Sequence, residues 1–283
     1  MKKSRELFQQ IVKELSDHYT QNEAESLSYR LLNHFFHLER KDIILNSPIE
    51  KSTTLLQPYL QRLKVYEPIQ YILGEEEFMN LNFCVNPNVL IPRPETEELV
   101  QLLLSENTIP NPTILDIGTG SGCIPISLAK NITNSKVSSI DISQKAIEVA
   151  QKNAKTHQVH VNFIHQNILE INELKETYDL IISNPPYVRE LEKDKMHQNV
   201  LDHEPQQALF VSDNDPLIFY RHIMKIANTN LKKGGKLYFE INEALGKELL
   251  SLAKNYHFEK SELKKDFLEK DRFLILTQSI KSL

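Results

Sequence analysis

The chain has 283 residues, of which 40% are hydrophobic and 25% charged, with seven Gly, two Cys and a formal net charge of −5. These values are ordinary for a globular protein and exclude collagen-like, low-complexity and disulfide-rich classes. Neutralising phosphates requires an excess of Lys and Arg, which this chain lacks. We therefore expect no nucleic acid as its main partner.

The cysteines and the N-terminal segment bear on the compartment. Cys84 and Cys123 are too few for a disulfide framework and lack CxxC spacing, so a reducing compartment, the cytoplasm, is expected. The N-terminal segment is basic but has no apolar block typical of a secretion signal, and no stretch approaches the length of a membrane span. We expect a monomer with no membrane association.

The first part of the chain shows helical periodicity. Apolar residues recur at spacings of three and four, at Leu7, Ile11 and Leu15, at Ala24, Leu27, Leu31 and Phe35, and at Leu56, Tyr59, Leu60 and Leu63. Thr20 or Asn22 is a candidate cap for the second helix. The pattern predicts a small helical bundle over residues 1–75.

The pattern then changes to alternation. Phe78, Leu81, Phe83 and Val85 precede an Asn-Pro-Asn turn at 86–88, which leads into an apolar run at 89–91. This arrangement predicts a β-hairpin that connects the bundle to the rest of the chain.

From residue 113 onward, short apolar runs alternate with helical patterns. Strands are predicted at 113–117, 136–140, 160–165, 178–183 and 236–241, with helices from Gly122, from Ser143, near 216–231 and ending near Tyr256. This alternation predicts an α/β fold with a mostly parallel sheet covered on both faces. Two last runs, at 258–263 and 272–277, lack a helix between them and predict an antiparallel hairpin at the sheet edge.

Three of the seven glycines, Gly118, Gly120 and Gly122, follow a predicted strand and open a predicted helix. Such a turn can set its amides and the helix N-terminus against a polar ligand, although it can also be a tight turn that merely needs small residues. Cys123 stands where a dinucleotide fold would have its third Gly, and no Lys-Ser/Thr follows as in a P-loop.

Asp141 ends the next predicted strand, about twenty residues after the glycine turn. An acidic side chain there can accept the ribose hydroxyls of a nucleoside, or it can cap the following helix, for which Ser143 is also available. A nucleoside pocket without a phosphate signature suits S-adenosylmethionine better than a dinucleotide.

The fourth strand of this series runs into Asn184-Pro185-Pro186-Tyr187. Two prolines stop the strand and fix the backbone, so that the Asn184 and Pro185 carbonyls and the Asn184 side-chain oxygen can accept the two hydrogens of a planar NH₂ group. Such a grip would aim the nitrogen lone pair at a sulfonium methyl. The alternative is a rigid loop with Tyr187 packed beneath it.

Together these motifs resemble the bacterial release-factor glutamine N5-methyltransferase family (PrmC/HemK). The resemblance covers nearly the whole chain and rests on segments 67–74, 89–97, 116–122, 184–187 and 204–209. Asn-Pro-Pro-Tyr alone is shared with adenine-N6 methyltransferases, whereas Ile-Pro-Arg-Pro-Glu-Thr-Glu at 91–97 is much more specific.

The resemblance implies a class I methyltransferase (Rossmann-like) domain with a seven-stranded sheet at 93–283. It further implies a helical domain at 1–75 that recognises the substrate protein, and a hairpin linker at 76–92. The implied activity is methyl transfer from S-adenosylmethionine to the side-chain amide nitrogen of the glutamine in the Gly-Gly-Gln motif of peptide chain release factors, which modulates translation termination.

By the same resemblance, residues are assigned to the site. The cofactor would be bound by Gly118, Thr119, Gly120, Ser121, Gly122, Asp141, Ile142, Asn167, Ile168 and Asn184. The substrate would be bound by Asn184, Pro185, Pro186, Tyr187, Arg93 and Glu95, with Asn184, Pro185 and Tyr187 catalytic. The family commonly has Asp where Asn167 stands.

Other interpretations stay open from the residues alone. Arg93, Glu95 and Glu97 can be solvent charges that open a helix capped near Thr96. The histidines form no ligand set, so we expect no metal. Two alternative functions are adenine-N6 methylation of DNA or RNA, which calls for a basic face, and a non-catalytic scaffold that binds the cofactor.

Overall fold

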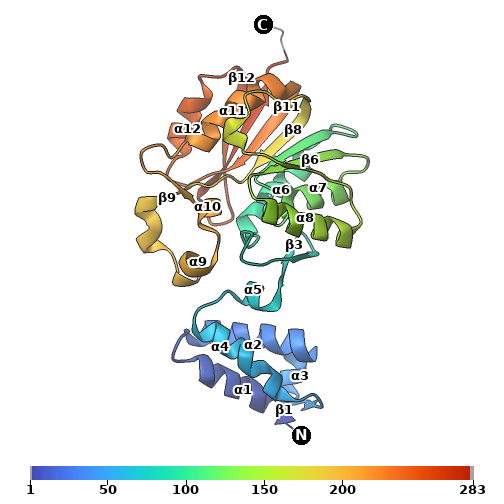
Figure 1. Cartoon of the computed structure of the whole chain (residues 1–283), viewed down its shortest axis with the longest axis vertical. Helices are drawn as coiled ribbons and strands as arrows, with labels where there is room; N and C mark the ends of the chain where they lie inside the picture. The colour runs from blue at the N-terminus through green and yellow to red at the C-terminus, as the bar shows by residue number, and fades with distance from the viewer. Residues whose placement is uncertain (1, 281–283) are drawn as a thin grey trace. The chain divides into compact units, whose positions relative to one another are not determined.

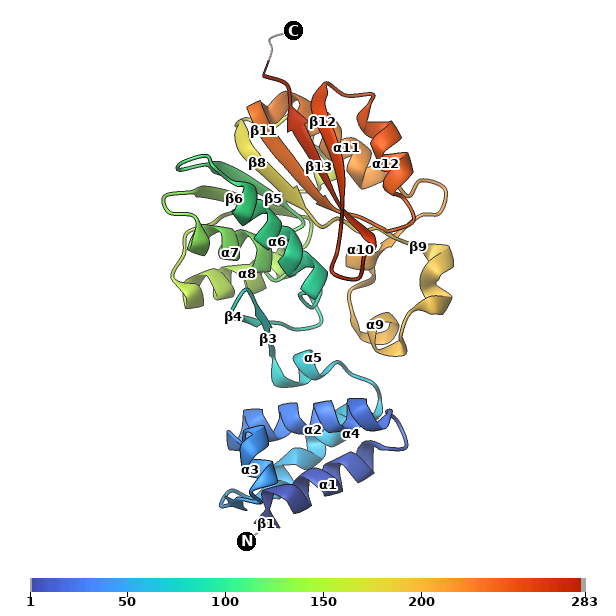
Figure 2. The same cartoon turned by 180° about the vertical axis from the view of Figure 1, so that it is seen from behind.

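The structure is a computed structural model that describes residues 2–280, and the chain divides into two compact units (Figures 1 and 2). The first unit comprises the residues up to Glu75 together with His197–His203. The second comprises Glu76–Met196 and the residues from Glu204 onward. Each unit buries its own apolar clusters, one in the first and two in the second.

The first unit is helical. Its elements are α1 (Ser4–Leu15), α2 (Gln21–Phe36), α3 (Arg40–Ile44), η1 (Thr53–Leu56), α4 (Gln57–Lys64), α5 (Ile69–Leu73), α9 (Gln198–His203) and a two-stranded pair of β1 (Lys2–Lys3) and β2 (Pro48–Ile49). The predicted bundle is confirmed, because Leu15, Leu31 and Leu63, from α1, α2 and α4, are all fully buried in one cluster.

Of the two candidate caps for α2, the structure selects Thr20. Its hydroxyl accepts from the Glu23 amide, while the Glu23 carboxylate accepts from the Thr20 amide at 3.0 Å. This reciprocal capping box satisfies two amides that the helix itself leaves unpaired.

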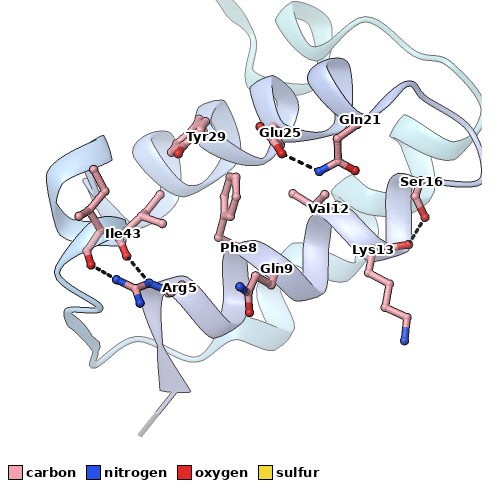
Figure 3. Close-up of a pocket in the computed structure, with 11 residues that line it drawn as sticks. Arg5, Phe8, Gln9, Val12, Lys13, Ser16, Gln21, Glu25, Tyr29 and Ile43 are labelled. Carbon is pink, nitrogen blue, oxygen red and sulfur yellow. Dashed lines mark hydrogen bonds between the residues drawn. The ribbon is translucent and has the colours of Figure 1, made fainter.

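A cavity of about 690 Å³ lies in this unit, bordered by α1, α2 and α3 (Figure 3). Phe8 and Val12 of α1 line it together with Tyr29 of α2, and the Arg5 guanidinium donates to the backbone carbonyls of Ile43 and Ile44. Its lining contains none of the residues assigned to the site from the sequence.

A hairpin of β3 (Glu75–Phe78) and β4 (Leu81–Cys84) opens the second unit, except that its first residue, Glu75, is grouped with the first unit. The hairpin is present, but its predicted turn is wrong. The strands join at Met79–Asn80, both of which have positive φ (53° and 58°), the backbone that a two-residue hairpin turn requires. The Asn-Pro-Asn segment forms a later turn, closed by the Val89 amide and the Asn86 carbonyl, and residues 89–91 form no strand.

The centre of this unit is a seven-stranded sheet in the order β12-β13-β11-β8-β5-β6-β7. The strands are β5 (Thr113–Ile117), β6 (Lys136–Asp141), β7 (Asn162–His165), β8 (Tyr178–Ser183), β11 (Leu231–Glu240), β12 (Phe258–Lys265) and β13 (Asp271–Gln278). The five strands from β11 to β7 are parallel, and β13 runs antiparallel to both of its neighbours. Both the mostly parallel sheet and its antiparallel edge are therefore confirmed.

Helices cover the two faces of the sheet (Figures 1 and 2). They are α6 (Pro94–Glu106), α7 (Cys123–Asn131) and α8 (Gln144–His157) on one face, and α11 (Ile218–Asn230) and α12 (Gly246–Ala253) on the other. Successive strand residues point to opposite faces, so Leu180 and Ile182 pack in the cluster with α6 and α7, while Ile181 packs in the cluster with α11 and α12.

Short elements complete the second unit. They are η2 (Ile168–Glu170), β9 (Val188–Arg189), η3 (Glu190–Lys195), α10 (Gln206–Leu209) and β10 (Phe210–Val211). Strands β9 and β10 pair in parallel and hold together the segments that follow β8 and α10. Across residues 2–280, no helix has both the length and the apolar character needed to cross a bilayer.

Candidate functional site

Four strands of the parallel sheet end side by side, and the residue that follows or closes each is polar or Gly. The pairing places Ile117 of β5 opposite Ile140 of β6 and Ser183 of β8, and Ser183 opposite Phe239 of β11. Asp141, Gly118, Asn184 and Glu240 therefore lie in a row along the carboxyl edge. The strand order reverses between β5 and β8, the place where open α/β sheets bind ligands.

The glycine turn between β5 and α7 is shaped by positive φ at all three glycines: 94° at Gly118, 52° at Gly120 and 82° at Gly122. A Cβ on Gly120 would meet nothing within 4 Å, whereas one on Gly122 would lie 2.8 Å from Ile126 Cδ1 and 3.0 Å from the Ala150 Cβ. Gly120 thus leaves open space beside the turn, and Gly122 lets α7 start close to α8.

Asn153 of α8 fixes the turn from behind. Its side chain is 1% exposed and donates to the carbonyls of Ser121 and Cys84, while its oxygen accepts from the Cys84 amide at 2.8 Å. One buried amide thereby ties the hairpin to the glycine turn.

Asp141 closes β6 with both carboxylate oxygens engaged. Oδ2 accepts from the Gly120 amide at 2.9 Å and Oδ1 from the Ser143 amide at 2.7 Å. Burial raises its pKa, and these two bonds act in the opposite direction. Ser143, not Asp141, caps α8, because its hydroxyl accepts from the Ala146 amide. Each oxygen of Asp141 keeps a lone pair for a further donor.

Asn167 and Ile168 lie beyond β7 and line a cavity that the glycine turn and Asp141 also line. The polar atoms of Asn167 are used locally, since its oxygen accepts from the Leu169 amide and its nitrogen donates to Glu170. Asn167 therefore acts as the cap of η2, and its neighbour Ile168 offers an apolar wall that is 8% exposed.

The Asn-Pro-Pro-Tyr segment leaves β8 between the glycine turn and β11. A Cβ on Gly118 would lie 3.5 Å from the Asn184 carbonyl oxygen, so the two strand exits approach closely. The Tyr187 hydroxyl donates to Glu240 Oε1 at 2.9 Å. Burial raises the pKa of Tyr187 well above its usual value, so its phenol stays protonated and serves as a donor.

The alternative in which α6 is capped near Thr96 is wrong. The helix starts at Pro94 with Arg93 as its N-cap, and proline suits the first position because its fixed φ is already helical. Thr96 is 3% exposed, and its hydroxyl donates to Glu240 Oε2 at 2.6 Å. Asn184 Nδ2 donates to the same Thr96 oxygen at 3.0 Å.

The charges of the Ile-Pro-Arg-Pro-Glu-Thr-Glu segment have different environments. Arg93 donates to the carboxylate of Glu204, whose side chain is 1% exposed and which also accepts from the Ile91 amide at 3.3 Å. Arg93 is thus not a free solvent charge. Glu95 is partly buried and adds negative charge near Glu240.

These residues surround a cavity of about 280 Å³. Of the residues assigned from the sequence, it is lined by Arg93, Gly118, Thr119, Gly120, Ser121, Asp141, Ile142, Asn167, Ile168, Asn184, Pro185 and Pro186. Glu95, Gly122 and Tyr187 lie outside this lining. For Gly122 and Tyr187 the reason is visible, since one packs α7 and the other points to Glu240.

Sequence reasoning gave no role to several residues of the site. Thr96, Pro205, Gln207, Ala208 and Phe219 also line the cavity, while Glu204 and Glu240 support its wall from buried positions. For Glu240 the available signal was an acidic residue at the end of an apolar strand, whereas Glu204 stands among polar residues, between His203 and Pro205. Within residues 2–280, no group of three or more His, Cys, Asp or Glu side chains is arranged to hold a metal.

A mostly parallel sheet with a glycine turn, an acidic residue after the next strand and a cavity at the switch point defines a class I methyltransferase fold. A family model described as "Methyltransferase small domain" matches residues 94–211, and one described as "PrmC N-terminal domain" matches residues 6–74. A solved methyltransferase from Pyrococcus furiosus has the same fold, with a TM-score of 0.54 at 18% identity, over 80% of this chain and 100% of that one.

Two curated relatives carry the name release factor glutamine methyltransferase. The protein from Flavobacterium psychrophilum is 49% identical, covering 94% of this chain and 95% of its own. The one from Bacteroides thetaiotaomicron is 44% identical, covering 92% and 95%. The chain belongs to the release factor glutamine methyltransferase family.

Proposed function

We propose that this chain transfers a methyl group from S-adenosylmethionine to the side-chain amide nitrogen of the glutamine in the Gly-Gly-Gln motif of peptide chain release factors. The observation that carries the proposal is the juxtaposition of Gly118 and Asn184 at the switch point. A turn suited to a nucleoside ligand and an acceptor-rich strand exit meet there, within one cavity.

The residues present fit the cofactor. Gly120 leaves open space beside the turn, Asp141 has lone pairs to spare for ribose hydroxyls, and Ile142 and Ile168 supply apolar wall for a base. Bound there, S-adenosylmethionine would supply an electrophilic methyl on a sulfonium sulfur. We assign the methionine end to residues 118–122, the ribose to Asp141 and the adenine neighbourhood to Ile142, Asn167 and Ile168.

The substrate amide suits the other side of the cavity. Its NH₂ group has two donors, and we assign them to the Asn184 side-chain oxygen and the Pro185 carbonyl. Because proline fixes φ and provides no N–H, this exit from β8 is rigid and presents acceptors only. We further assign Pro186, Tyr187, Arg93 and Glu95 to the surroundings of the substrate glutamine.

The contribution of these residues to the rate is positional. An amide nitrogen is a weak nucleophile because its lone pair is delocalised, so holding both hydrogens and aiming the lone pair matters more than a strong base. With the cofactor held by residues 118–122 and Asp141, the nitrogen would bond to the methyl carbon as the sulfur–carbon bond breaks, and the nitrogen would then lose one proton to water. The product is S-adenosylhomocysteine and N5-methylglutamine.

The domain roles follow from the same proposal. We assign release-factor recognition to the helical domain at 1–75, linkage to the hairpin at 76–92, and cofactor binding and transfer to 93–283. The match of a PrmC N-terminal model to residues 6–74 and the unit boundary after Glu75 support this division.

We further infer that the chain works in the cytoplasm, where release factors act, as a monomer and without nucleic acid as a direct partner. The net charge of −5 supports the last point. Light scattering of the purified chain, alone and with duplex DNA, tests both the monomer and the lack of affinity for nucleic acid.

The activity is tested with purified chain, isotope-labelled cofactor and a release factor. The expected result is one methyl group on the target glutamine, located by fragment mass spectrometry. The matched control is the same release factor with that Gln changed to Asn, whose amide is one methylene shorter.

The control release factor is expected to stay unlabelled. Equal labelling of both release factors would contradict the proposal. Labelling of adenine in a DNA or RNA arm, with none on the release factor, would favour the nucleic-acid alternative instead.

A further inference from the structure

A chain of buried hydrogen bonds connects the end of β11 to the Asn-Pro-Pro-Tyr segment through the first turn of α6. Glu240, which is 1% exposed, accepts from the Thr96 hydroxyl at 2.6 Å and from the Tyr187 hydroxyl at 2.9 Å. Thr96 accepts in turn from Asn184 Nδ2 at 3.0 Å. Three segments far apart in sequence thus meet on one carboxylate.

With Glu240 ionised, the direction of each bond follows from proton counting. Burial raises the pKa of Glu240, while the hydrogen bonds from Thr96 and Tyr187 and the charge of Arg272 act in the opposite direction. A carboxylate only accepts, and a Thr hydroxyl has one proton to donate. Once Thr96 donates its proton to Glu240, its oxygen can only accept from Asn184. The NH₂ end of the Asn184 amide must therefore face Thr96, because the opposite orientation would set two acceptors against each other.

The orientation of this amide decides what the cavity offers to a ligand. Asn184 lines the cavity, and its Oδ1 accepts no hydrogen bond from the part of the chain that the structure describes. With the amide turned over, the cavity would present an NH₂ group. The NH₂ group of Asn184 would then face the NH₂ group of the target glutamine, donor against donor, and the nitrogen lone pair would no longer point at the methyl group.

We propose that Thr96 and Glu240 are positioning residues that set the polarity of the Asn184 amide, so that its oxygen and not its nitrogen meets the target NH₂ group. The inference rests on the proposed function and deepens it. Neither residue needs to touch substrate or cofactor through its polar atoms, because both act through Asn184.

The first turn of α6 is suited to this task. Glu204, which is buried, holds the N-cap residue Arg93, and Pro94 has a φ that is already helical. The position of Thr96 relative to the sheet is therefore fixed. Tyr187 occupies the other oxygen of Glu240. The carboxylate therefore holds both ends of the Asn-Pro-Pro-Tyr segment: Tyr187 directly, and Asn184 through Thr96.

The experiment compares Thr96→Val, which keeps the shape and removes the hydroxyl, with Thr96→Ser, which keeps the hydroxyl. Loss of one buried hydrogen bond predicts a kcat for Thr96→Val lower by about tenfold. The Kd for S-adenosylmethionine should stay within about twofold, because its contacts are assigned to other residues. The KM for the release factor should also stay within about twofold, because its recognition is assigned to the helical domain, which the substitution does not touch. Thr96→Ser should retain at least about half of the wild-type kcat.

Thr113→Val is the matched control. Its hydroxyl also donates to a carboxylate, that of Asp179 at 2.7 Å, but at the opposite end of β5. Its kcat should equal that of the wild type, whatever happens to its melting temperature. Wild-type enzyme must methylate the release factor in the same assay. If it does not, the proposed function fails, and the polarity proposal fails with it.

Three results would overturn the polarity proposal while leaving the function intact. They are a wild-type kcat for Thr96→Val, an equal fall for Thr96→Ser, and a loss that lies in cofactor affinity alone. If Thr96→Val does not fold, Glu240→Ala is decisive. It leaves the Thr96 hydroxyl free to donate to the Asn184 oxygen, so an unchanged kcat for that variant would also overturn the proposal.

Discussion

The Arg93 guanidinium lies 2.5 Å from the Glu204 carboxylate, and the two partners differ sharply in burial. The Glu204 side chain is 1% exposed and that of Arg93 31%. They join the segment that opens α6 to the segment that precedes α10, and both segments contribute to the wall of the cavity. The pair therefore fixes one side of the candidate site.

Because of this difference in burial, we expect substitutions of the two partners to reduce the unfolding free energy by different amounts. Arg93→Ala leaves a buried carboxylate with only the Ile91 amide, and should reduce the unfolding free energy by about 2–4 kcal/mol. Glu204→Gln leaves Arg93 within reach of water, and should have an effect of about 1 kcal/mol. The melting temperatures, followed by circular dichroism, measure the ranking.

The matched control is Arg221→Ala, which breaks an exposed ion pair with Asp215. It should change stability by less than about 1 kcal/mol. A larger effect for Glu204→Gln than for Arg93→Ala would show that burial does not govern this pair.

Two glycines of the same turn should respond differently to alanine. Gly122→Ala places a Cβ 2.8 Å from Ile126 Cδ1 at a positive φ, and should lower stability by about 2–4 kcal/mol. Gly120→Ala meets no protein atom within 4 Å, so its effect on stability should be about 1–2 kcal/mol, from φ alone.

For cofactor affinity we expect the opposite order, with a larger loss for Gly120→Ala than for Gly122→Ala. The Cβ of Gly120→Ala enters the open space beside the turn, and calorimetric titration should show weakened binding of S-adenosylhomocysteine. Unchanged affinity in a folded Gly120→Ala protein would place the cofactor elsewhere.

Asp141 and Asn167 form a second matched pair. Asp141→Asn has one acceptor oxygen for two backbone amides, so either Gly120 or Ser143 loses its partner and ribose recognition suffers. Cofactor affinity should fall by at least about tenfold. Asn167→Ala removes polar atoms already used within η2 and should change affinity by less than about threefold. A larger loss for Asn167→Ala would contradict these assignments.

Asp116, buried in the strand before the glycine turn, predicts a pH dependence of stability. Burial raises its pKa from an ordinary 3.8 to about 7; the Ser139 hydrogen bond opposes this rise and the Asp141 charge adds to it. A raised folded-state pKa means that the protonated form stabilises the fold fully below about pH 4. This contribution is lost as the pH rises through 7.

The change at Asp116 is on the order of 2–3 kcal/mol between pH 5 and pH 8. Wild-type protein should therefore lose more stability over that interval than Asp116→Asn, which does not titrate. Urea unfolding of both proteins at the two pH values measures the difference. Parallel pH dependences would mean that Asp116 ionises in the folded protein as it does in water.

Local patterns predicted most of the fold. The runs at 113–117 and 178–183 match β5 and β8 in full, because buried parallel strands are short apolar segments bounded by turn residues. The hairpin turn was misplaced because Met79 and Asn80 adopt positive φ without Gly or Pro to mark them. Their conformation is set by the pairing of β3 with β4, which the turn residues themselves do not reveal.

The motifs indicated the cavity but not its support. Gly118, Asp141 and Asn184 were recognisable because each follows or closes a strand. Thr96 was given no role in the site because its partner, Glu240, lies 144 residues away in sequence. Contacts of that kind depend on the register between strands and on the placement of α6, which no local pattern encodes.

The central claim is that Asn184 and Pro185 offer their oxygens to a glutamine amide opposite a cofactor held on the glycine turn. Its most direct test is a crystal structure of the protein with S-adenosylhomocysteine and a release factor. The account predicts the glutamine Nε2 within hydrogen-bond distance of Asn184 Oδ1 and the Pro185 carbonyl, with its lone pair toward the sulfur. A glutamine bound elsewhere, or an Asn184 oxygen turned toward Thr96, would contradict it.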